Sequence, residues 1–409
     1  MEGPSAQGQA LLCCRLHHPE LLGVKTMTVL FLCAAFLLLY SFFGYPLILL
    51  SMAAARGRRK RSCTYKELPS VMFVFACCWE GKRLEEKIKN CLALDYPSEK
   101  LDVVAVSDAA TPETLEILRR AEREGILRVL ENPRRSGKSA GLARALAQCE
   151  ADIFVVTDAD ALLEPHHLNE LVAPFADPKV GATTGTIHYV NVGESGISRN
   201  EGIYWRFEML TRKAESLLGR LIGVIGAIYA VRPALFNVED PRLDADFLAP
   251  LQVLEQGKKV LLLDRVSARD FSPATTTSLF ARRVRTITLA LWSLARNGRY
   301  LNPFRFPVLS WQTWSHKILR WLLPVFMILI FISNAFLVTT SLFWQILFGC
   351  QVLFYLAGAL GAWVSKRKLN VPLVSSIWYF ILSAWASIVA FFNLLRGKDY
   401  SVWTETARR

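Results

Sequence analysis

Three long stretches without a single charged residue constrain this chain most: Thr26 to Ala55, Trp321 to Ser365 and Leu369 to Leu395. About 20 apolar residues are needed for a helix to cross a bilayer. The lengths therefore predict one, two and one membrane helices, about four in total. Hydrophobic residues make up 52% of the 409-residue chain, which is high for a soluble protein. An integral membrane protein is the expectation.

Basic residues beside these stretches indicate how the chain crosses the membrane. The first stretch is too long and starts too late for a cleaved signal. It is followed at once by a basic run: Arg56, Arg58, Arg59, Lys60 and Arg61. Such runs stay in the cytoplasm, so we expect the N-terminus outside and the next region inside. Four full spans would leave the C-terminus outside, against the preference of its basic residues: Arg396, Lys398, Arg408 and Arg409. We therefore expect the stretch from Leu369 to Leu395, with Pro372 near its start, to be re-entrant or interfacial.

Composition predicts the following division of the chain. Charges and alternating patterns of a soluble domain occur only between the first two membrane regions, and a segment rich in aromatic residues, prolines and bases follows that domain. The expected parts are an N-terminal tail (1–25), a membrane helix (26–55), a cytosolic domain (62–298), an interfacial segment (299–320), a membrane region of two to three helices (321–395) and a C-terminal tail (396–409).

Charge and cysteine content exclude two classes of function. The net charge is +13, but it is concentrated beside the membrane segments and no stripe interleaves basic and aromatic residues, so we expect no nucleic-acid partner. The nine cysteines include the adjacent pairs Cys13/Cys14 and Cys77/Cys78, and none forms a CxxC. We expect reduced packing cysteines rather than a zinc site or a disulfide framework.

Short runs rich in Val and Ile alternate with helix patterns between Pro69 and Asp264. The runs are "SVMFVFACC", "LDVVAVSD", "LRVLEN" and "ADIFVVTD", and helices are expected from about Glu80, over "PETLEILRRAERE" and from Gly137. This order predicts an α/β domain whose mostly parallel sheet has helices on both faces. Ligands bind outside the carboxyl ends of such strands. Asp108 and the pair Asp158/Asp160 are therefore expected to share one cleft.

The string "IFVVTDADALLEP" ends a buried strand in two aspartates, Asp158 and Asp160. Two carboxylates this close repel each other unless a positive charge lies between them. Mg²⁺ or Mn²⁺ suits such oxygen ligands. A solvated turn that caps the following helix is the other interpretation.

Seven strings occur in the order and approximate spacing of the membrane-embedded, processive glycosyltransferases of family 2. They are "VVAVSDAATPETLEI", "NPRRSGKSAGLARAL", "VVTDADALLEP", "EGIYWRFEM", "GAIYAVRPALF", "DADFLAPLQVLEQGKKV" and "ARRVRTITLALW". From about Tyr45 to the terminal "VWTETARR" the chain resembles this family, which includes cellulose, chitin, hyaluronan and poly-N-acetylglucosamine synthases.

The resemblance implies a GT-A fold, the fold of nucleotide-diphospho-sugar transferases, in the plasma (inner) membrane with the catalytic domain in the cytoplasm. It implies an inverting transfer of a sugar from a nucleoside-diphosphate donor, expected to be a UDP-sugar, to a growing polysaccharide by single displacement. In the family, the residue that matches Asp160 holds Mg²⁺ or Mn²⁺ against the diphosphate as a Lewis acid. The implied nucleotide-sugar contacts are Glu80, Asp108, Lys138, Asp158, Arg282, Arg283 and Arg285. For Lys138, a solvated basic loop is the alternative.

An inverting transfer needs a base that takes the proton of the acceptor hydroxyl. The resemblance aligns "LDADFLAPL" so that Asp246 is this base. Asp244 is its competitor, because Ala245 replaces the first acid of the usual pair, and a helix cap is the alternative for either aspartate. The implied acceptor contacts are Gly226, Ala227, Trp205, Glu208 and Trp292. For Trp292 a place at the membrane interface is the alternative, and core packing explains the neighbouring Tyr204 and Phe207 equally well.

Departures from the family pattern occur at Trp79, Ala109, Ala245 and Thr286. They leave open a degenerate, non-catalytic membrane scaffold. A second alternative is transfer of a single sugar to a lipid acceptor, which the same kind of domain can perform. About four spans make a narrow channel, which favours a homo-oligomer or an export partner if the product is a polymer.

Overall fold

The computed structural model describes residues 18–57, 65, 67–189, 196–270, 275–367, 369 and 371–402, with backbone alone for 18–21, 189 and 196–205. The chain divides into two compact units, which are described one at a time. The first contains Pro46–Trp314 and Ala386–Arg409 and is called the catalytic unit after the role that the sequence predicts for it; the second contains Met1–Tyr45 and Ser315–Trp385 and is called the membrane unit for its apolar helices.

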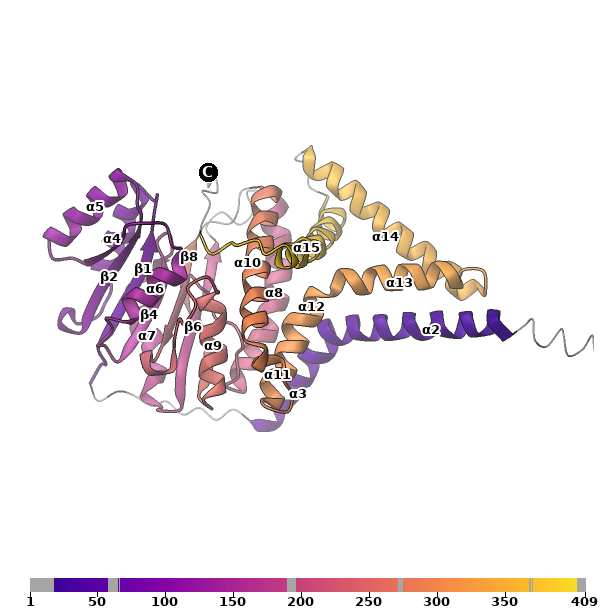
Figure 1. Ribbon diagram of the computed structural model, residues 1–409, viewed down its shortest axis with the longest axis horizontal. Helices are drawn as coiled ribbons and strands as arrows, with labels where there is room; N and C mark the ends of the chain where they lie inside the picture. Colours follow the sequence, from indigo (N-terminus) through magenta and orange to yellow (C-terminus); the bar gives the residue numbers. More distant parts are fainter. Residues whose placement is uncertain are drawn as a thin grey trace, which may run out of the picture. The chain divides into compact units, whose positions relative to one another are not determined.

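One sheet organises the catalytic unit (Figure 1). Its eight strands within the described residues follow the order β3-β2-β1-β4-β7-β6-β8-β5. The first four are parallel to one another: β1 (Val71–Cys77), β2 (Leu101–Asp108), β3 (Arg128–Asn132) and β4 (Ile153–Asp158). The other half is mixed: β5 (Leu162–Leu163), β6 (Val180–Tyr189), β7 (Ile228–Val231) and β8 (Lys259–Asp270). The predicted mostly parallel α/β sheet is confirmed.

The hydrophobic runs of the sequence become strands because both faces of the sheet are covered. All seven residues of β1 are buried, as expected where helices pack on both sides of parallel strands. The covering helices are α4 (Arg83–Leu92), α5 (Pro112–Arg123), α6 (Lys138–Leu146), α7 (His167–Val172), α8 (Gly196–Leu217), α9 (Ala245–Glu255) and α10 (Thr276–Arg296). The short elements η2 (Ser98–Lys100), η3 (Ala173–Ala176), η4 (Pro233–Leu235), η5 (Gly298–Leu301) and α11 (Pro307–Thr313) connect them.

Two helix starts show how local sequence sets the boundaries. The helix expected from about Glu80 begins only at Arg83, because Gly81 takes a left-handed conformation with φ of +52°. The helix α5 begins where expected. Thr111 accepts a hydrogen bond from the Thr114 amide, and Pro112 occupies the first turn, where its missing N–H costs nothing.

Strand register brings the expected site residues to one edge of the sheet. Cys77 at the end of β1 pairs with Ser107, and Ala76 pairs with Asp158. Asp108 and Asp158 therefore end strands on either side of β1, at the carboxyl edge where open α/β sheets bind ligands.

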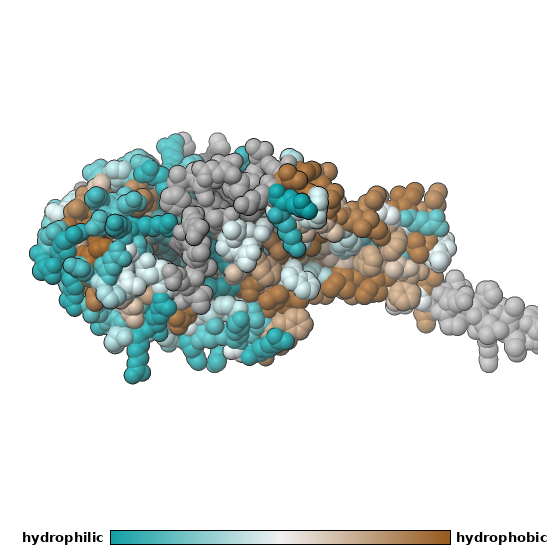
Figure 2. All heavy atoms as spheres, turned by 90° about the horizontal axis from the view of Figure 1, so that it is seen from above, coloured by the Kyte–Doolittle hydropathy of each residue, from teal (hydrophilic) through white to brown (hydrophobic). Residues whose placement is uncertain are grey.

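The membrane unit is helical and apolar, and Figure 2 shows hydrophobic residues gathered over it. It contains α2 (His18–Leu39), η1 (Tyr40–Gly44), η6 (Trp314–Ile318), α12 (Leu319–Trp321), α13 (Leu323–Leu337), α14 (Leu342–Lys366) and much of α15 (Pro372–Leu395), while α3 (Tyr45–Arg56) continues into the catalytic unit. Within the described residues, three helices are long and apolar enough to cross a membrane, or four if the bent pair Pro307–Trp321 and Leu323–Leu337 forms one span. The prediction of about four spans agrees with this range.

Candidate functional site

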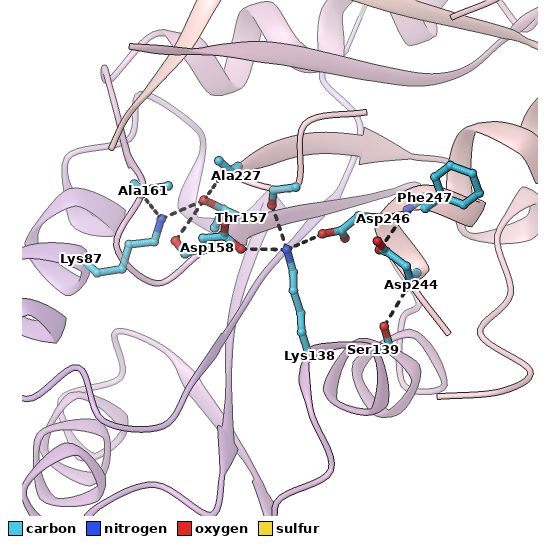
Figure 3. A network of polar contacts seen from close by, with 12 residues as sticks. Lys87, Lys138, Ser139, Thr157, Asp158, Ala161, Ala227, Asp244, Asp246 and Phe247 are labelled. Atoms are coloured by element: carbon cyan, nitrogen blue, oxygen red, sulfur yellow. Dashed lines mark hydrogen bonds and ion pairs between the residues drawn. The ribbon is translucent and has the colours of Figure 1, made fainter. Parts of the chain in front are cut away.

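The side chain of Lys138 joins four separate parts of the catalytic unit (Figure 3). Lys138 is the first residue of α6, after Gly137, whose φ of +85° turns the chain into the helix. Its Nζ donates to Asp158 Oδ1 at 2.8 Å, Asp246 Oδ2 at 2.7 Å and the Gly226 carbonyl at 2.9 Å. The lysine therefore brings the end of β4, the start of α9 and the segment before β7 into one cluster.

The charge of Lys138 is balanced by the two carboxylates. Burial alone would lower the pKa of Lys138, but the charges and hydrogen bonds of Asp158 and Asp246 outweigh it and raise the pKa. The ammonium therefore stays protonated near neutral pH. One ammonium does not balance two ionised carboxylates, so the cluster attracts a further cation rather than an isolated anion.

The two aspartates that compete for the role of base have different surroundings. Asp244 is the N-cap of α9, and its carboxylate accepts from the Phe247 amide at 3.1 Å. Burial, followed by the charge of Asp246, raises the pKa of Asp244 to about 6. Asp246 lies in the first turn, where Oδ2 meets Lys138, while Oδ1 is buried and has no hydrogen bond to any residue that the structure describes. The cap interpretation therefore describes Asp244, and Asp246 retains a buried acceptor atom.

Tyr229 is a neighbour of Asp246 that sequence reasoning missed. Its hydroxyl is buried and approaches the carboxylate without reaching full hydrogen-bond geometry. Burial, and then the charge of Asp246, raises the pKa of Tyr229 well above its ordinary value. The only signal in the sequence is a tyrosine inside the strand of "GAIYAVRP", which packing explains equally well.

Asp108 organises the loop that leads to Lys138. Its Oδ1 accepts from the Ser136 amide at 2.8 Å and its Oδ2 from the Gly137 amide at 2.9 Å. The carboxylate is 1% exposed. Asp108 and Asp158 therefore meet through the loop before α6, and Asp108 clamps the backbone whose next residue is Lys138.

The end of β1 carries a stacked pair of side chains. The Arg135 guanidinium lies 4.2 Å from the Trp79 ring centroid and donates to Cys78 Sγ at 3.1 and 3.3 Å. Glu80 Oε2 accepts from the Cys78 amide at 2.6 Å. The departure at Trp79 thus has a packing partner in Arg135, and Glu80 lies beside the same strand end.

Three arginines of α10 are predicted to contact the nucleotide sugar, and one of them, Arg285, lies near the aspartates of the cluster. Burial lowers the pKa of Arg285. The charges of Asp244 and Asp158 offset part of this effect, so the guanidinium lies within range of both carboxylates. Its Nε donates to the Tyr400 carbonyl at 3.4 Å. Arg283 is half-buried and Arg282 is exposed on the same helix. The arginine-rich element thus reaches the acid cluster through Arg285.

The residues predicted to contact the acceptor do not all lie together. A Cβ on Gly226 would collide with Asp246 Oδ2, so this position requires glycine. The Ala227 carbonyl accepts from Thr157 Oγ1 at 2.9 Å, next to the cluster. Trp292 donates from Nε1 to the Lys398 carbonyl at 3.3 Å. Glu208 is 6% exposed and pairs with Arg212 at 2.9 Å inside α8, and the side chain of Trp205 lies outside the described residues.

The turn with Asp158 and Asp160 fits a divalent cation that is shared with a substrate. Mg²⁺ is typically bound by one or two carboxylates together with substrate phosphates and water. The turn offers two carboxylates, one of which also meets Lys138. No group of three or more His, Cys, Asp or Glu side chains in the described parts of the chain is arranged to hold a metal. Two carboxylates in one turn are the donor set that a divalent cation shared with substrate phosphates requires.

Comparison with known proteins supports this interpretation of the fold. Residues 72–236 match the family described as glycosyl transferase family 2. The chain is 27% identical to the poly-beta-1,6-N-acetyl-D-glucosamine synthase of Staphylococcus aureus (strain COL) over 128 residues, 31% of either chain. It is also 27% identical over 139 residues to the probable glycosyltransferase YdaM of Bacillus subtilis (strain 168), 33% of either chain. The aligned region thus spans about a third of these curated relatives.

Among solved structures, the mannosyltransferase PcManGT of Pyrobaculum calidifontis, in complex with GDP-Man and Mn²⁺, has a TM-score of 0.67 at 24% identity. The likeness covers 90% of this chain and 100% of the other, and it concerns the fold. Together with the matched family, it confirms the GT-A fold expected from the sequence. Residues 72–236 therefore match glycosyl transferase family 2, and part of the chain is similar to a polysaccharide synthase.

Proposed function

We propose that this chain is a membrane-bound, inverting glycosyltransferase that moves a sugar from a nucleoside-diphosphate donor onto a growing polysaccharide. The observation that carries the proposal is the cluster in which Lys138 joins Asp158 to Asp246 at the carboxyl edge of the sheet. The similarity to a polysaccharide synthase and the candidate membrane helices support a polymeric product. The charges around Arg56 support a cytoplasmic active site in the plasma (inner) membrane.

In this proposal Asp246 is the base. Its buried Oδ1, which has no hydrogen-bond partner among the described residues, would accept the proton of the acceptor hydroxyl. The acceptor oxygen forms a bond to the anomeric carbon while the bond from that carbon to the diphosphate oxygen breaks. The departing electron pair stays on the diphosphate, whose added charge is stabilised by Lys138 and Arg285.

A divalent cation would be held by Asp160, with Asp158 beside it, and would supply Lewis-acid stabilisation of the diphosphate. Mg²⁺ and Mn²⁺ both suit this donor set. The PcManGT structure, which contains GDP-Man and Mn²⁺, supports this choice of cofactor and donor class. We expect a UDP-sugar, and GDP-mannose is the natural comparison.

Donor screening with purified full-length protein in lipid tests the proposal. UDP-GlcNAc, UDP-glucose and GDP-mannose are supplied with Mn²⁺ or Mg²⁺, and the products are separated by size. We expect one donor to give a polymer. A single-sugar glycolipid product would replace the polymeric assignment with transfer to a lipid acceptor. No turnover of any donor would contradict the enzymatic proposal and favour a non-catalytic scaffold.

Two substitutions assign the roles. Asp246→Asn is expected to abolish transfer while nucleotide binding persists, because only the base is lost. Asp160→Asn is expected to abolish transfer and to weaken metal-dependent nucleotide binding as well. The control is Asp264→Asn, at an exposed aspartate paired with Lys213. Turnover at the wild-type rate in Asp246→Asn or Asp160→Asn would exclude the corresponding role.

A further inference from the structure

Lys87 is a buried cation that the proposed reaction does not use. It lies in α4, is 0% exposed and belongs to the largest fully buried side chains of the described chain. Its Nζ lies 5.3 and 5.8 Å from the ring centroids of Phe73 and Phe75. Burying an ammonium costs free energy, and an apolar side chain of similar size is often no less stabilising. Packing alone therefore does not explain a lysine at this position.

Lys87 forms hydrogen bonds to the residues on either side of the two-aspartate turn, Asp158 to Asp160 (Figure 3). Nζ donates to Thr157 Oγ1 at 3.1 Å and to the Ala161 carbonyl at 2.5 Å. These two residues immediately precede and follow the turn. The Ala161 amide also donates to the Asp158 carbonyl at 3.2 Å, which closes the turn on itself. One ammonium thus holds both ends of the segment that presents the carboxylates.

The same contact extends to the segment next to Asp246. Thr157 Oγ1, which accepts from Lys87, donates to the Ala227 carbonyl at 2.9 Å. The preceding carbonyl, that of Gly226, accepts from Lys138. Displacement of Lys87 would therefore loosen both the turn and the segment that approaches the base.

Electrostatics agree with this arrangement. Burial lowers the pKa of Lys87 to about 8, while the negative charges of Cys91 in its thiolate form and of Asp158 would raise it. Asp158 thus lies between two lysines, Lys138 on the side of Asp246 and Lys87 on the side of α4. When Lys138 turns toward a diphosphate, the charge of Lys87 still opposes the repulsion between Asp158 and Asp160.

We propose that Lys87 is a positioning residue that holds the Asp158 to Asp160 turn in the geometry required by the donor diphosphate and its divalent cation. This inference rests on the proposed function, because it needs the turn to bind that pair. Lys87 itself touches neither substrate nor metal. It acts through Thr157 and Ala161.

The test compares Lys87→Met with Lys89→Met, a substitution at an exposed lysine of the same helix. Hydrogen–deuterium exchange of residues 153–165 measures the order of the turn, and calorimetry measures UDP and GDP affinity with and without Mn²⁺. For Lys87→Met we expect faster exchange and roughly tenfold weaker Mn²⁺-dependent affinity, as is common for residues that orient metal ligands. Metal-free affinity should not change. Lys89→Met should match the wild type in every measurement.

Several results would overturn the inference. The first is a Lys87→Met protein that binds UDP and GDP in the presence of Mn²⁺ as tightly as the wild type does, whatever its exchange rates. This result would leave the proposed function intact. If Lys87→Met fails to fold, Thr157→Val removes the hydroxyl link at similar shape, and it too must weaken the Mn²⁺-dependent affinity. If the wild type binds neither nucleotide with Mn²⁺, the proposed function fails and this inference fails with it.

Discussion

Ala109 has a backbone conformation that suits glycine. Its φ is +49°, the only positive value at a non-glycine residue within the described chain. It follows Asp108, and its amide donates to the Asn132 carbonyl at 3.0 Å, so the turn is held in place. The departure from the family pattern at Ala109 thus places an alanine in a left-handed backbone conformation. The hydrogen bond to Asn132 maintains a strained residue beside Asp108.

We predict that Ala109→Gly stabilises the protein. A left-handed backbone costs an L-residue about 1–2 kcal/mol, which the substitution to glycine removes. Glycine also gives the unfolded chain more conformational freedom, which lowers the stability of the folded state by about 0.4–1 kcal/mol. The net expectation is a rise of about 0.5–1 kcal/mol in stability, measured as a higher thermal unfolding midpoint. Gly81→Ala, at another left-handed turn, should lower the midpoint. A lower midpoint in Ala109→Gly would contradict the strain argument.

Asp244 should make stability depend on pH. Its folded pKa of about 6 exceeds the 3.8 of an exposed aspartate, because burial, and then Asp246, disfavours the ionised form. Between pH 3.8 and about 6, Asp244 is protonated in the folded protein and ionised in the unfolded chain. This group therefore stabilises the fold at low pH and loses that contribution as pH rises through 6. The difference corresponds to at most about 3 kcal/mol.

The corresponding variant is Asp244→Asn, which keeps a capping side chain without a charge. We expect it to unfold at a higher temperature than the wild type at about pH 7.5, and the two midpoints to converge as the pH approaches about 4. Thermal unfolding across this range measures the effect. A difference between the two proteins that does not vary with pH would show that Asp244 is ionised throughout.

At the scale of elements, α14 and α15 pack through glycines. A Cβ on Gly361 would lie 2.7 Å from Trp378 Cβ and would also collide with the Val374 carbonyl. Small residues allow membrane helices to approach closely, where packing rather than the hydrophobic effect holds them together. The close approach of these two helices therefore depends on Gly361.

Gly361→Val is predicted to disturb this helix pair. Overpacking typically costs about 1–3 kcal/mol, so the thermal midpoint of the protein in detergent should fall by several degrees. Gly349→Val is the matched control, because an added Cβ there meets nothing within 4 Å in the described structure. Equal midpoints for the two variants would contradict the proposed contact.

For the whole molecule, the C-terminal segment determines the membrane topology. Trp292 and Arg285 donate to the carbonyls of Lys398 and Tyr400, and residues 386–409 belong to the catalytic unit. If the apolar helices cross a membrane as expected, the chain returns to the side of the domain, which requires an even number of full crossings after it. Three apolar stretches follow the domain, so one of them does not cross.

We predict that α13 and α14 cross and that α15 does not. The end of α14 and its connection to α15 contain Lys366, Arg367 and Lys368, whereas the connection between α13 and α14 has no basic residue. Positive charge favours the catalytic side. In a variant without native cysteines, Thr340→Cys should react with an impermeant maleimide from the opposite side, and Leu369→Cys from the catalytic side. The reverse pattern would make α13 the segment that does not cross.

The sequence by itself determined the α/β sheet and the candidate membrane helices, because these depend on local periodicity, and motifs of a few adjacent residues indicated the family that residues 72–236 match. Runs such as "VMFVFAC" have a single stable environment, a strand covered on both faces. The aspartates of the site were also predictable, since each lies at the end of a strand or at the start of a helix. The start of α4 was predicted less well, because the left-handed Gly81 delays it.

Only the tertiary structure decided how these residues meet. Lys138 and Asp246 are 108 positions apart in the sequence and form an ion pair of 2.7 Å. The separate roles of Asp244 and Asp246, the approach of Tyr229 and the burial of Lys87 depend on packing between distant segments. A lysine in "EEKIKN" looks like any exposed helix residue until the fold buries it. Pairwise electrostatics fall off with distance and change with burial, and the sequence specifies neither for distant residues.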